Sequence, residues 1–368
     1  MFKDKEKITI AVGPAGAWPS AFTKVMAERN HNVRLFFRNP LDLEYFQSKH
    51  QTPRLPGIEM SPNVKGFTDV KTWIDGAELV ALGPPSIHFR EFWNTVKTSV
   101  KNKTDILILS KGLEQITHLR MSEIILQTDS SRIDHIAVLS GPNQAQEVAE
   151  GELAGATLAA YNKSTGNRLQ KRLNSKSFNV YTSDDVVGVE IAAALKNVLA
   201  LGAGMADGFK VASSTKAFYL TRALGEITAI GTTIRNTPLK GHESTFIGLA
   251  GCGDFSLSCY GGNTRNHWAG ERIVEGWSVQ KILAAKTLEG YYALQTAKDL
   301  IRGEEDQYPI ISALYGIWYE DVPIRGNINQ LLGRQPVKEQ FKDKGFGFRT
   351  TIFLMRMLHN LRLSHIRK

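Results

Sequence analysis

Lys196 lies in a stretch of small apolar residues, SDDVVGVEIAAALKNVLALGAGMADG, at residues 183–208. In a helix, its neighbours one turn away on either side would all be apolar, with no carboxylate among them: Ala192, Ala193, Leu199 and Ala200. Burial there should lower the pKa of Lys196, so that it can exchange a proton with a substrate oxygen near neutral pH. Carbonyl reduction and alcohol oxidation both need such a group, and Asn197 could orient the same substrate. The alternative is a lysine that reaches water beside a tightly packed helix.

A second group of polar residues lies in a glycine-dense segment, GLAGCGDFSLSCYGGNTRN, at residues 248–266. It supplies a carboxylate, a hydroxyl, a guanidinium and an amide, on Asp254, Thr264, Arg265 and Asn266. Glycines let the backbone approach a ligand closely, and a guanidinium binds phosphate through paired hydrogen bonds. We therefore predict a ligand-binding loop. The alternative is a polar loop in which Arg265 pairs with Asp254.

The first forty residues predict elements that could hold a nucleotide. Residues 8–12, ITIAV, and residues 32–37, NVRLFF, are strand-like apolar runs. Between them stand a Gly-rich turn, GPAGAWP, and a segment with helical spacing, SAFTKVMAERN. This order is typical of the first βαβ unit of a doubly wound sheet, in which the start of the helix faces a pyrophosphate. Prolines interrupt the turn, however, and the third glycine of the dinucleotide fingerprint is missing.

Five further segments continue the strand pattern, the first two as buried parallel strands: residues 77–85, 104–112, 135–151, 156–161 and 178–183. Ligands of open sheets bind at the carboxyl ends of the strands, so we expect four residues there to meet a bound molecule: Pro85, Ser86, Ser110 and Lys111. Lys111 could equally be a solvated loop lysine. The intervening segment, residues 48–64, is polar and contains prolines, and it predicts a surface loop or short helix.

Beyond residue 183 the strand pattern gives way to long Ala- and Leu-rich helical segments. The predicted fold class is α/β, with an N-terminal Rossmann-type doubly wound sheet in residues 1–183 and an all-α C-terminal domain in residues 184–368. A chain of 368 residues with 42% hydrophobic and 22% charged residues suits a soluble protein of two domains.

Composition also narrows the class of ligand. A net charge of +9 suits an anionic ligand such as a phosphate ester or a dinucleotide. The sequence has no run of five basic residues and no basic stripe interleaved with aromatics, so we expect no nucleic-acid partner. The spacing of Cys252 and Cys259 matches no zinc or redox motif, which predicts no metal site and a reducing compartment.

The ends of the chain bear on location. The first residues, MFKDKEK, lack the apolar core of a signal peptide, and no uncharged apolar run reaches the roughly 18 residues that span a bilayer. We therefore expect a cytoplasmic protein with no stable membrane insertion. Residues 337–368 combine apolar and basic residues, with no acid after Asp343. They predict a terminal helix packed on its own domain or on a dimer mate, the alternative being a helix on an anionic membrane surface.

Taken in order, these motifs resemble those of NAD(P)-dependent glycerol-3-phosphate dehydrogenase of the bacterial type. The resemblance runs from about residue 8 to about residue 297. The segments that carry it are GAWPSAF, TPRLPGI, SKGLE, LSGPNQAQEVA, the helix around Lys196, GLAGCGD and NTRN. The ordered series is more specific than any single motif.

The resemblance implies a role for each matching residue. Lys196 would donate and accept the proton at the reacting carbon, and Lys111 would be the second catalytic lysine, in contact with substrate and cofactor. The substrate-binding positions would be Lys111, Gly141, Asn143, Asn197, Asp254, Thr264, Arg265 and Asn266. The positions for NAD or NADP would be Gly16, Ala17, Trp18, Arg38, Lys111, Ala145, Arg265 and Glu289. The family also implies frequent homodimers.

The sequence departs from the family pattern at the nucleotide turn. Pro14 stands where the first fingerprint glycine belongs and Pro19 replaces the third, so the turn must follow an altered path or lose backbone donors. Asn143 replaces a serine and Gln144 an aromatic residue. Arg38 follows the second strand, at the place where an acidic residue would bind the ribose 2′-hydroxyl of NAD. The sequence therefore weakly favours an enzyme that also accepts NADP.

The expected activity is hydride transfer between NAD(P)H and C2 of dihydroxyacetone phosphate, giving sn-glycerol 3-phosphate for glycerophospholipid synthesis. Two alternatives remain open. One is another β-hydroxyacid-type dehydrogenase, against which the phosphate-binding NTRN segment argues. The other is a non-catalytic binding or sensor protein, an alternative that the two prolines of the nucleotide turn suggest.

Overall fold

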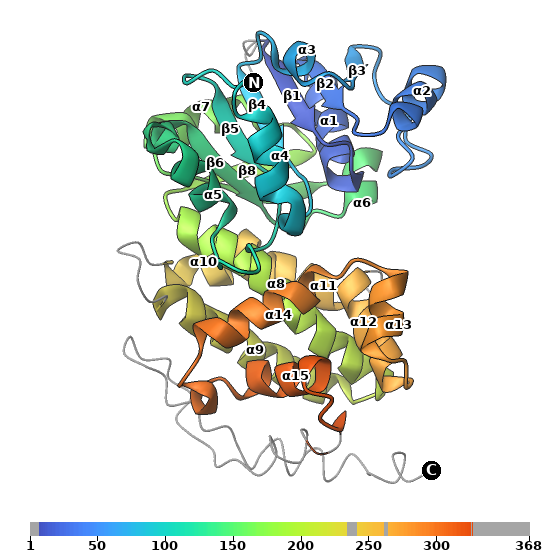
Figure 1. Cartoon of the computed structure of the whole chain (residues 1–368), viewed down its shortest axis with the longest axis vertical. Coiled ribbons are helices and arrows are strands. Elements are labelled where there is room, and N and C mark those ends of the chain that lie inside the picture. The colour runs from blue at the N-terminus through green and yellow to red at the C-terminus, as the bar shows by residue number, and fades with distance from the viewer. Residues whose placement is uncertain (1–6, 234–240, 261–263, 325, 327–368) are drawn as a thin grey trace. The chain divides into compact units, whose positions relative to one another are not determined.

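The chain forms two compact units, Met1–Glu190 and Ile191–Lys368. Its structure is a computed structural model that describes residues 7–233, 241–260, 264–324 and 326 (Figure 1). Helix α8, Val186–Gly208, begins in the first unit and continues into the second. The predicted domain boundary, residue 183, is the last residue of strand β8.

The described part of the first unit is built on an eight-stranded sheet with the order β3-β2-β1-β4-β5-β6-β7-β8. Its strands are β1 Thr9–Gly13, β2 Asn32–Phe36, β3 Val64–Phe67, β4 Leu79–Leu82, β5 Asp105–Ile108, β6 Ile136–Ser140, β7 Ala154–Ala160 and β8 Phe178–Ser183. The strands from β3 to β6 pair in parallel, β7 is antiparallel to β6, and β8 is parallel to β7. The first six strands thus have the order of a doubly wound dinucleotide-binding sheet, which confirms the predicted fold class.

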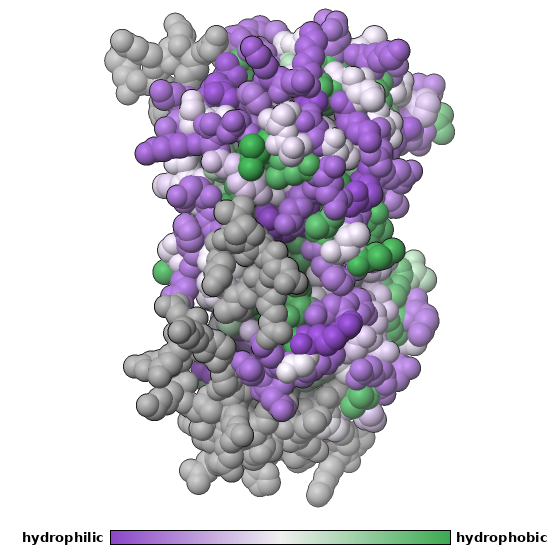
Figure 2. All heavy atoms as spheres, turned by 60° about the vertical axis from the view of Figure 1, so that its left-hand side comes forward, coloured by the Kyte–Doolittle hydropathy of each residue, from purple (hydrophilic) through white to green (hydrophobic). Residues whose placement is uncertain are grey.

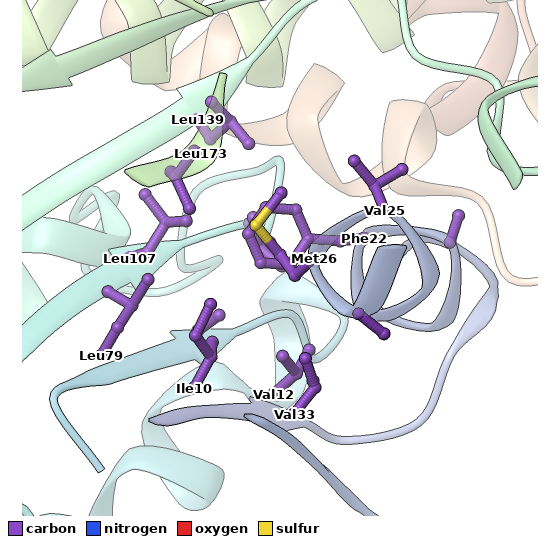
Figure 3. Close-up of a cluster of buried hydrophobic side chains, with 14 of the residues drawn as sticks. Ile10, Val12, Phe22, Val25, Met26, Val33, Leu79, Leu107, Leu139 and Leu173 are labelled. Atoms are coloured by element: carbon purple, nitrogen blue, oxygen red, sulfur yellow. The ribbon is translucent and has the colours of Figure 1, made fainter. Parts of the chain in front are cut away.

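Helices cover both faces of this sheet, which is why strands such as Leu79–Leu82 are buried at every position. They are α1 Ala17–Glu28, α2 Pro40–Lys49, α3 Val70–Ile74, α4 Phe89–Val96, α5 Met121–Thr128, α6 Ala145–Glu150 and α7 Lys163–Leu173, with 3₁₀ turns at Ser86–His88 and Ser130–His135. Figure 3 shows how α1 packs: Phe22 and Met26 lie against Ile10 and Leu107 of the sheet. This packing fixes the start of α1 relative to the end of β1.

The surface position predicted for residues 48–64 was wrong in part. Residues 40–49 form α2, and the following residues are irregular, with a bridge between Thr52 and Leu55. Leu55, Ile58 and Met60 are 2%, 7% and 2% exposed and belong to the core of the unit. The prolines prevent regular secondary structure in this segment, but the apolar side chains between them are still buried, because burial removes them from water.

The regular structure in the described residues of the second unit is all helical. After α8 come α9 Ser213–Thr233, α10 Glu243–Ile247, the π-helical turn η3 Leu249–Gly253, α11 Asp254–Tyr260, α12 Arg265–Val274, α13 Val279–Ala285, α14 Glu289–Leu300, a 3₁₀ turn Glu305–Gln307 and α15 Pro309–Tyr319. The predicted loop at residues 248–266 is therefore largely helical. The predicted terminal helix within residues 337–368 lies outside the described residues.

Helix α8 is long and apolar enough to cross a membrane by length and hydropathy, but 94% of its most apolar window is buried inside the protein. That burial is typical of a core helix. Over the described residues visible in Figure 2, polar side chains predominate and apolar ones form small scattered groups.

Candidate active site

Lys196 is almost fully buried, with 7% of its surface exposed, which rules out the alternative of a lysine that reaches water. Its ammonium forms an ion pair with the carboxylate of Asp254 and donates to Ser258 Oγ at 3.0 Å. Asp254 and Ser258 lie one turn apart on α11, so both side chains point to the same side. The prediction of apolar neighbours along α8 holds, but a carboxylate from another helix faces the ammonium.

A buried amide network adjoins this ion pair. Asn266 Nδ2 donates to Asn197 Oδ1 at 3.0 Å, and the backbone N–H of Gly290 donates to Asn266 Oδ1 at 3.0 Å. Asn197 and Asn266 are 9% and 7% exposed. Gly290 is required here, because a Cβ would collide with the carbonyl of Asn197. The network joins α8, α12 and the start of α14, where Glu289 is half-buried.

The start of α12 carries Thr264, Arg265 and Asn266, which are the described residues of the NTRN segment. Thr264 caps the helix: its Oγ1 accepts from the N–H of His267 and donates to the carbonyl of Ser258 at 3.1 Å. Arg265 is the first residue of the helix and is exposed. Since the carboxylate of Asp254 is 1% exposed and faces Lys196, the alternative of an Arg265–Asp254 pair does not hold. The positive end of α12 and the guanidinium are thus presented together, a combination that favours an anion.

In the first unit, the carboxyl ends of β5 and β6 bring a further set of residues together. Lys111 Nζ donates to the carbonyl of Gly141 at 3.1 Å, and Asn143 Nδ2 donates to the carbonyl of Gly155 at 2.9 Å. Gly141 must be a glycine because a Cβ would lie 2.6 Å from that same Gly155 oxygen. Asn143 Oδ1 is buried and has no hydrogen-bond partner among the described residues. Of the other predicted strand-end residues, Ser110 donates to the carbonyl of Pro84 at 2.5 Å.

The nucleotide turn accommodates both of its prolines. The Gly13–Pro14 bond is cis, and the N–H of Ala15 donates to the carbonyl of Phe36 at 2.7 Å. Helix α1 still begins at Ala17, after Gly16, and Pro19 occupies the third helical position, where an N–H would have no partner within the helix. Pro14 and Pro19 bring no backbone N–H to this turn, as the sequence predicts for proline.

Four further residues predicted to bind the cofactor are Ala17, Trp18, Arg38 and Ala145. Trp18 is half-buried, its ring centroid 6.2 Å from that of Phe178, and its Nε1 is buried with no partner among the described residues. Ala145 opens α6 and packs with Trp18 against the core of the unit. Ala17 and Arg38 are exposed, Ala17 at the first position of α1 and Arg38 two residues after β2.

Models of one protein family match most of the chain. The model of the NAD-dependent glycerol-3-phosphate dehydrogenase N-terminus matches residues 9–166, and that of the C-terminus matches residues 185–329. The chain belongs to the NAD-dependent glycerol-3-phosphate dehydrogenase family.

Individual relatives agree with this assignment. Glycerol-3-phosphate dehydrogenase [NAD(P)+] of Shouchella clausii is 35% identical over 330 residues, which is 88% of this chain and 96% of the relative. The enzyme of the same name from Limosilactobacillus reuteri is 34% identical over 337 residues, 90% of this chain and 98% of the relative. The crystal structure of glycerol-3-phosphate dehydrogenase from Coxiella burnetii superposes with a TM-score of 0.81 at 28% identity, covering 89% of this chain and 99% of that one.

Sequence reasoning about this glycerol-3-phosphate dehydrogenase family member missed Ser258 and a buried network at the start of α8. There, Arg120 Nη1 donates to Glu190 Oε2 at 2.9 Å, and Ser122 donates to the same carboxylate through its N–H and its hydroxyl. Burial raises the pKa of Glu190, and the positive charge of Arg120 opposes that effect. The spacing of Asp254 and Ser258, one helical turn, was the signal available for Ser258.

Proposed function

We propose that this chain is an NAD(P)-dependent glycerol-3-phosphate dehydrogenase, which interconverts dihydroxyacetone phosphate and sn-glycerol 3-phosphate. The observation that carries the proposal is the buried contact of Lys196 with Asp254 and Ser258, beside the Asn197–Asn266 pair, in a chain matched by the family models over both units. A lysine held among buried groups is a suitable proton donor and acceptor at a carbonyl oxygen.

The first unit suits a dinucleotide. Gly16 and the exposed Ala17 leave backbone N–H groups at the start of α1 open to a pyrophosphate, although Pro19 supplies none. The buried Trp18 Nε1 and Asn143 Oδ1, both without partners among the described residues, are polar groups that a ligand at this edge could satisfy. We assign the cofactor to Gly16, Ala17, Trp18, Arg38, Lys111, Ala145, Arg265 and Glu289. When bound, NADH or NADPH supplies the hydride for C2 of the substrate.

The proton is the protein's contribution to the reaction. In the direction of reduction, Lys196 gives a proton to the oxygen on C2, and in the direction of oxidation it takes that proton back. Asp254 and Ser258 hold the ammonium in place, so that little reorganisation is needed as charge develops on the oxygen. Lys111, through its positive charge, is assigned to the stabilisation of the same oxygen.

The phosphate of the substrate is assigned to the first turn of α12. Arg265 is exposed there, and the N-terminus of a helix favours an anion. Asn266, Thr264, Asp254, Asn197, Asn143 and Gly141 complete the proposed substrate positions. The fit of a guanidinium to a phosphate favours this substrate over an unphosphorylated β-hydroxyacid.

We further propose a cytoplasmic, soluble homodimer whose product feeds glycerophospholipid synthesis. The apolar α8 is buried within the protein, which supports a core helix. The spacing of the two cysteines supports a reducing compartment, and Cys259 is buried.

The deciding experiment measures oxidation of NADH and NADPH by the purified full-length protein with dihydroxyacetone phosphate, side by side. A panel of small unphosphorylated keto acids serves as the control substrate set. Oxidation that depends on dihydroxyacetone phosphate supports the proposal. Preference for a keto acid would favour the β-hydroxyacid alternative, and cofactor binding without turnover on any substrate would favour the sensor.

A further inference from the structure

Three polar side chains form a cluster on the far end of α8 from Lys196. Asp207, the penultimate residue of α8, accepts from Lys216 Nζ at 2.7 Å and from His267 Nε2 at 2.7 Å. Lys216 belongs to the first turn of α9, and His267 is the third residue of α12. His267 is 2% exposed, so its imidazole is enclosed by the protein. No role in the reaction has been given to any of the three.

The hydrogen bonds of the His267 imidazole show which ring nitrogen is the donor. Because a carboxylate accepts only, Nε2 of His267 must carry the hydrogen that reaches Asp207. Its Nδ1 is buried without a hydrogen-bond partner among the described residues, so the contact of Nε2 with Asp207 fixes the orientation of the ring. Lys216 balances the charge of Asp207, and the imidazole is a hydrogen-bond donor in a fixed orientation.

This donor is attached to the turn that carries the assigned phosphate-binding residues. Thr264, Arg265 and Asn266 directly precede His267, whose backbone N–H is capped by Thr264. The backbones of α8 and α12 also touch here. A Cβ at Gly204 would collide with the carbonyl of His267, and a Cβ at Gly270 would collide with the carbonyl of Leu201.

Such backbone contacts set the distance between the two helices and turn the face of Gly270 toward α8, and side-chain hydrogen bonds further limit the rotation of α12 about its own axis. Two such bonds join the first turn of α12 to α8: Asn266 donates to Asn197 at the second residue of the helix, and His267 donates to Asp207 at the third. A rotation of the first turn would move Arg265 and Asn266 with it, since residues of one turn are rigidly related.

We propose that His267 and Asp207 are positioning residues, whose hydrogen bond aims Arg265 and Asn266 at the phosphate and so sets the preference for a phosphorylated substrate. This inference rests on the proposed function. It assigns neither residue to contact with substrate. Loss of the bond should therefore affect dihydroxyacetone phosphate and leave unphosphorylated dihydroxyacetone, which has no phosphate to hold, nearly untouched.

The test compares kcat/KM for dihydroxyacetone phosphate and for dihydroxyacetone in full-length variants. His267→Leu removes the donor and leaves Asp207 paired with Lys216, so no isolated charge is created. We expect the ratio of kcat/KM for dihydroxyacetone phosphate to kcat/KM for dihydroxyacetone to fall about tenfold or more, because KM for dihydroxyacetone phosphate should rise. A change of this size is expected when one charge-assisted hydrogen bond to the phosphate is weakened. His267→Gln, whose amide nitrogen can donate toward Asp207, should restore the ratio to within about threefold of wild type.

Lys216→Met is the matched control, since it removes the ion pair and keeps the His267–Asp207 bond. It should lower the melting temperature and leave the substrate ratio unchanged. If His267→Leu does not fold, Asp207→Ala removes the acceptor from the other side and should lower the ratio in the same way. An unchanged ratio in the leucine variant, or an equal fall in Lys216→Met, overturns the inference. A wild-type protein that does not reduce dihydroxyacetone phosphate overturns the proposed function instead.

Discussion

Lys196 and Asp254 form an ion pair whose side chains are only 9% and 1% exposed. Little water reaches either group, so the interactions of each charge with protein groups replace its hydration. Removal of one partner from a buried pair leaves an isolated charge in the interior, whereas replacement of both partners by neutral groups avoids that penalty. The two kinds of replacement therefore separate the structural role of the pair from its proposed role in catalysis.

Lys196→Met should lower the free energy of unfolding by about 3–5 kcal/mol, since it removes a cationic partner from the buried carboxylate of Asp254. The double variant with Asp254→Asn should regain most of that stability. Neither variant should regain turnover, because the proton donor is missing, and a loss of about a hundred- to ten-thousandfold in kcat is expected. Urea unfolding and steady-state kinetics measure the two effects. Activity of the double variant within tenfold of wild type would show that the proton comes from elsewhere.

Arg265→Ala should raise KM for dihydroxyacetone phosphate by about tenfold or more, through loss of a charge-assisted contact with the phosphate. Arg302→Ala is a suitable control, because Arg302 is also an exposed arginine of the second unit and pairs locally with Asp299. Steady-state kinetics at saturating NADH measure both. Equal KM values for the two variants would place the phosphate away from Arg265.

Much of the architecture was accessible from local sequence patterns. The segment around Leu79–Leu82 is apolar at every position, which indicates a strand covered on both faces, and the structure places it at the centre of the sheet. Likewise, the alanines one turn from Lys196 predicted its burial. The partner of Lys196 could not be found this way, because Asp254 is 58 positions distant and the contact depends on the packing of α8 against α11.

In two segments, glycines or prolines predicted a loop where the structure has buried residues. The glycines at residues 248–253 suggested a loop, although Phe255 and Cys259, one turn apart, are both buried on one side of α11. Prolines near Leu55 suggested an exposed loop, although that leucine is in the core. In both segments the tendency of apolar side chains to leave water decided the outcome.

Pro19 is the departure most open to a direct test. Its ring is packed on Gly83, where a Cβ would lie 2.5 Å from Pro19 Cγ. Pro19→Ala restores the N–H of the third helical position and keeps α1 helical, and we expect it to tighten NADH binding a few-fold by supplying one more donor to the pyrophosphate. Titration of nicotinamide fluorescence measures the dissociation constant. Weaker binding would mean that the turn depends on the packing of the proline ring on Gly83.

Asp207 should make stability depend on pH in a predictable direction. Burial alone would raise the pKa of Asp207, but hydrogen bonds from Lys216 and His267 outweigh burial and hold the pKa below its ordinary value of 3.8. The folded protein therefore binds this proton less tightly than the unfolded chain does, so the contribution of Asp207 to stability is complete above the unfolded pKa and is lost as pH falls through the folded pKa. Asp207→Asn removes that titration and keeps the size of the side chain.

The free energy of unfolding of wild type should exceed that of Asp207→Asn at about pH 5, and the difference should shrink as pH falls through about 4 toward 3. Urea unfolding at each pH measures the difference, and titrating groups that do not interact with Asp207 contribute equally to both proteins. A difference that stayed constant into acid, or widened, would show that Lys216 and His267 do not favour the charged form of Asp207.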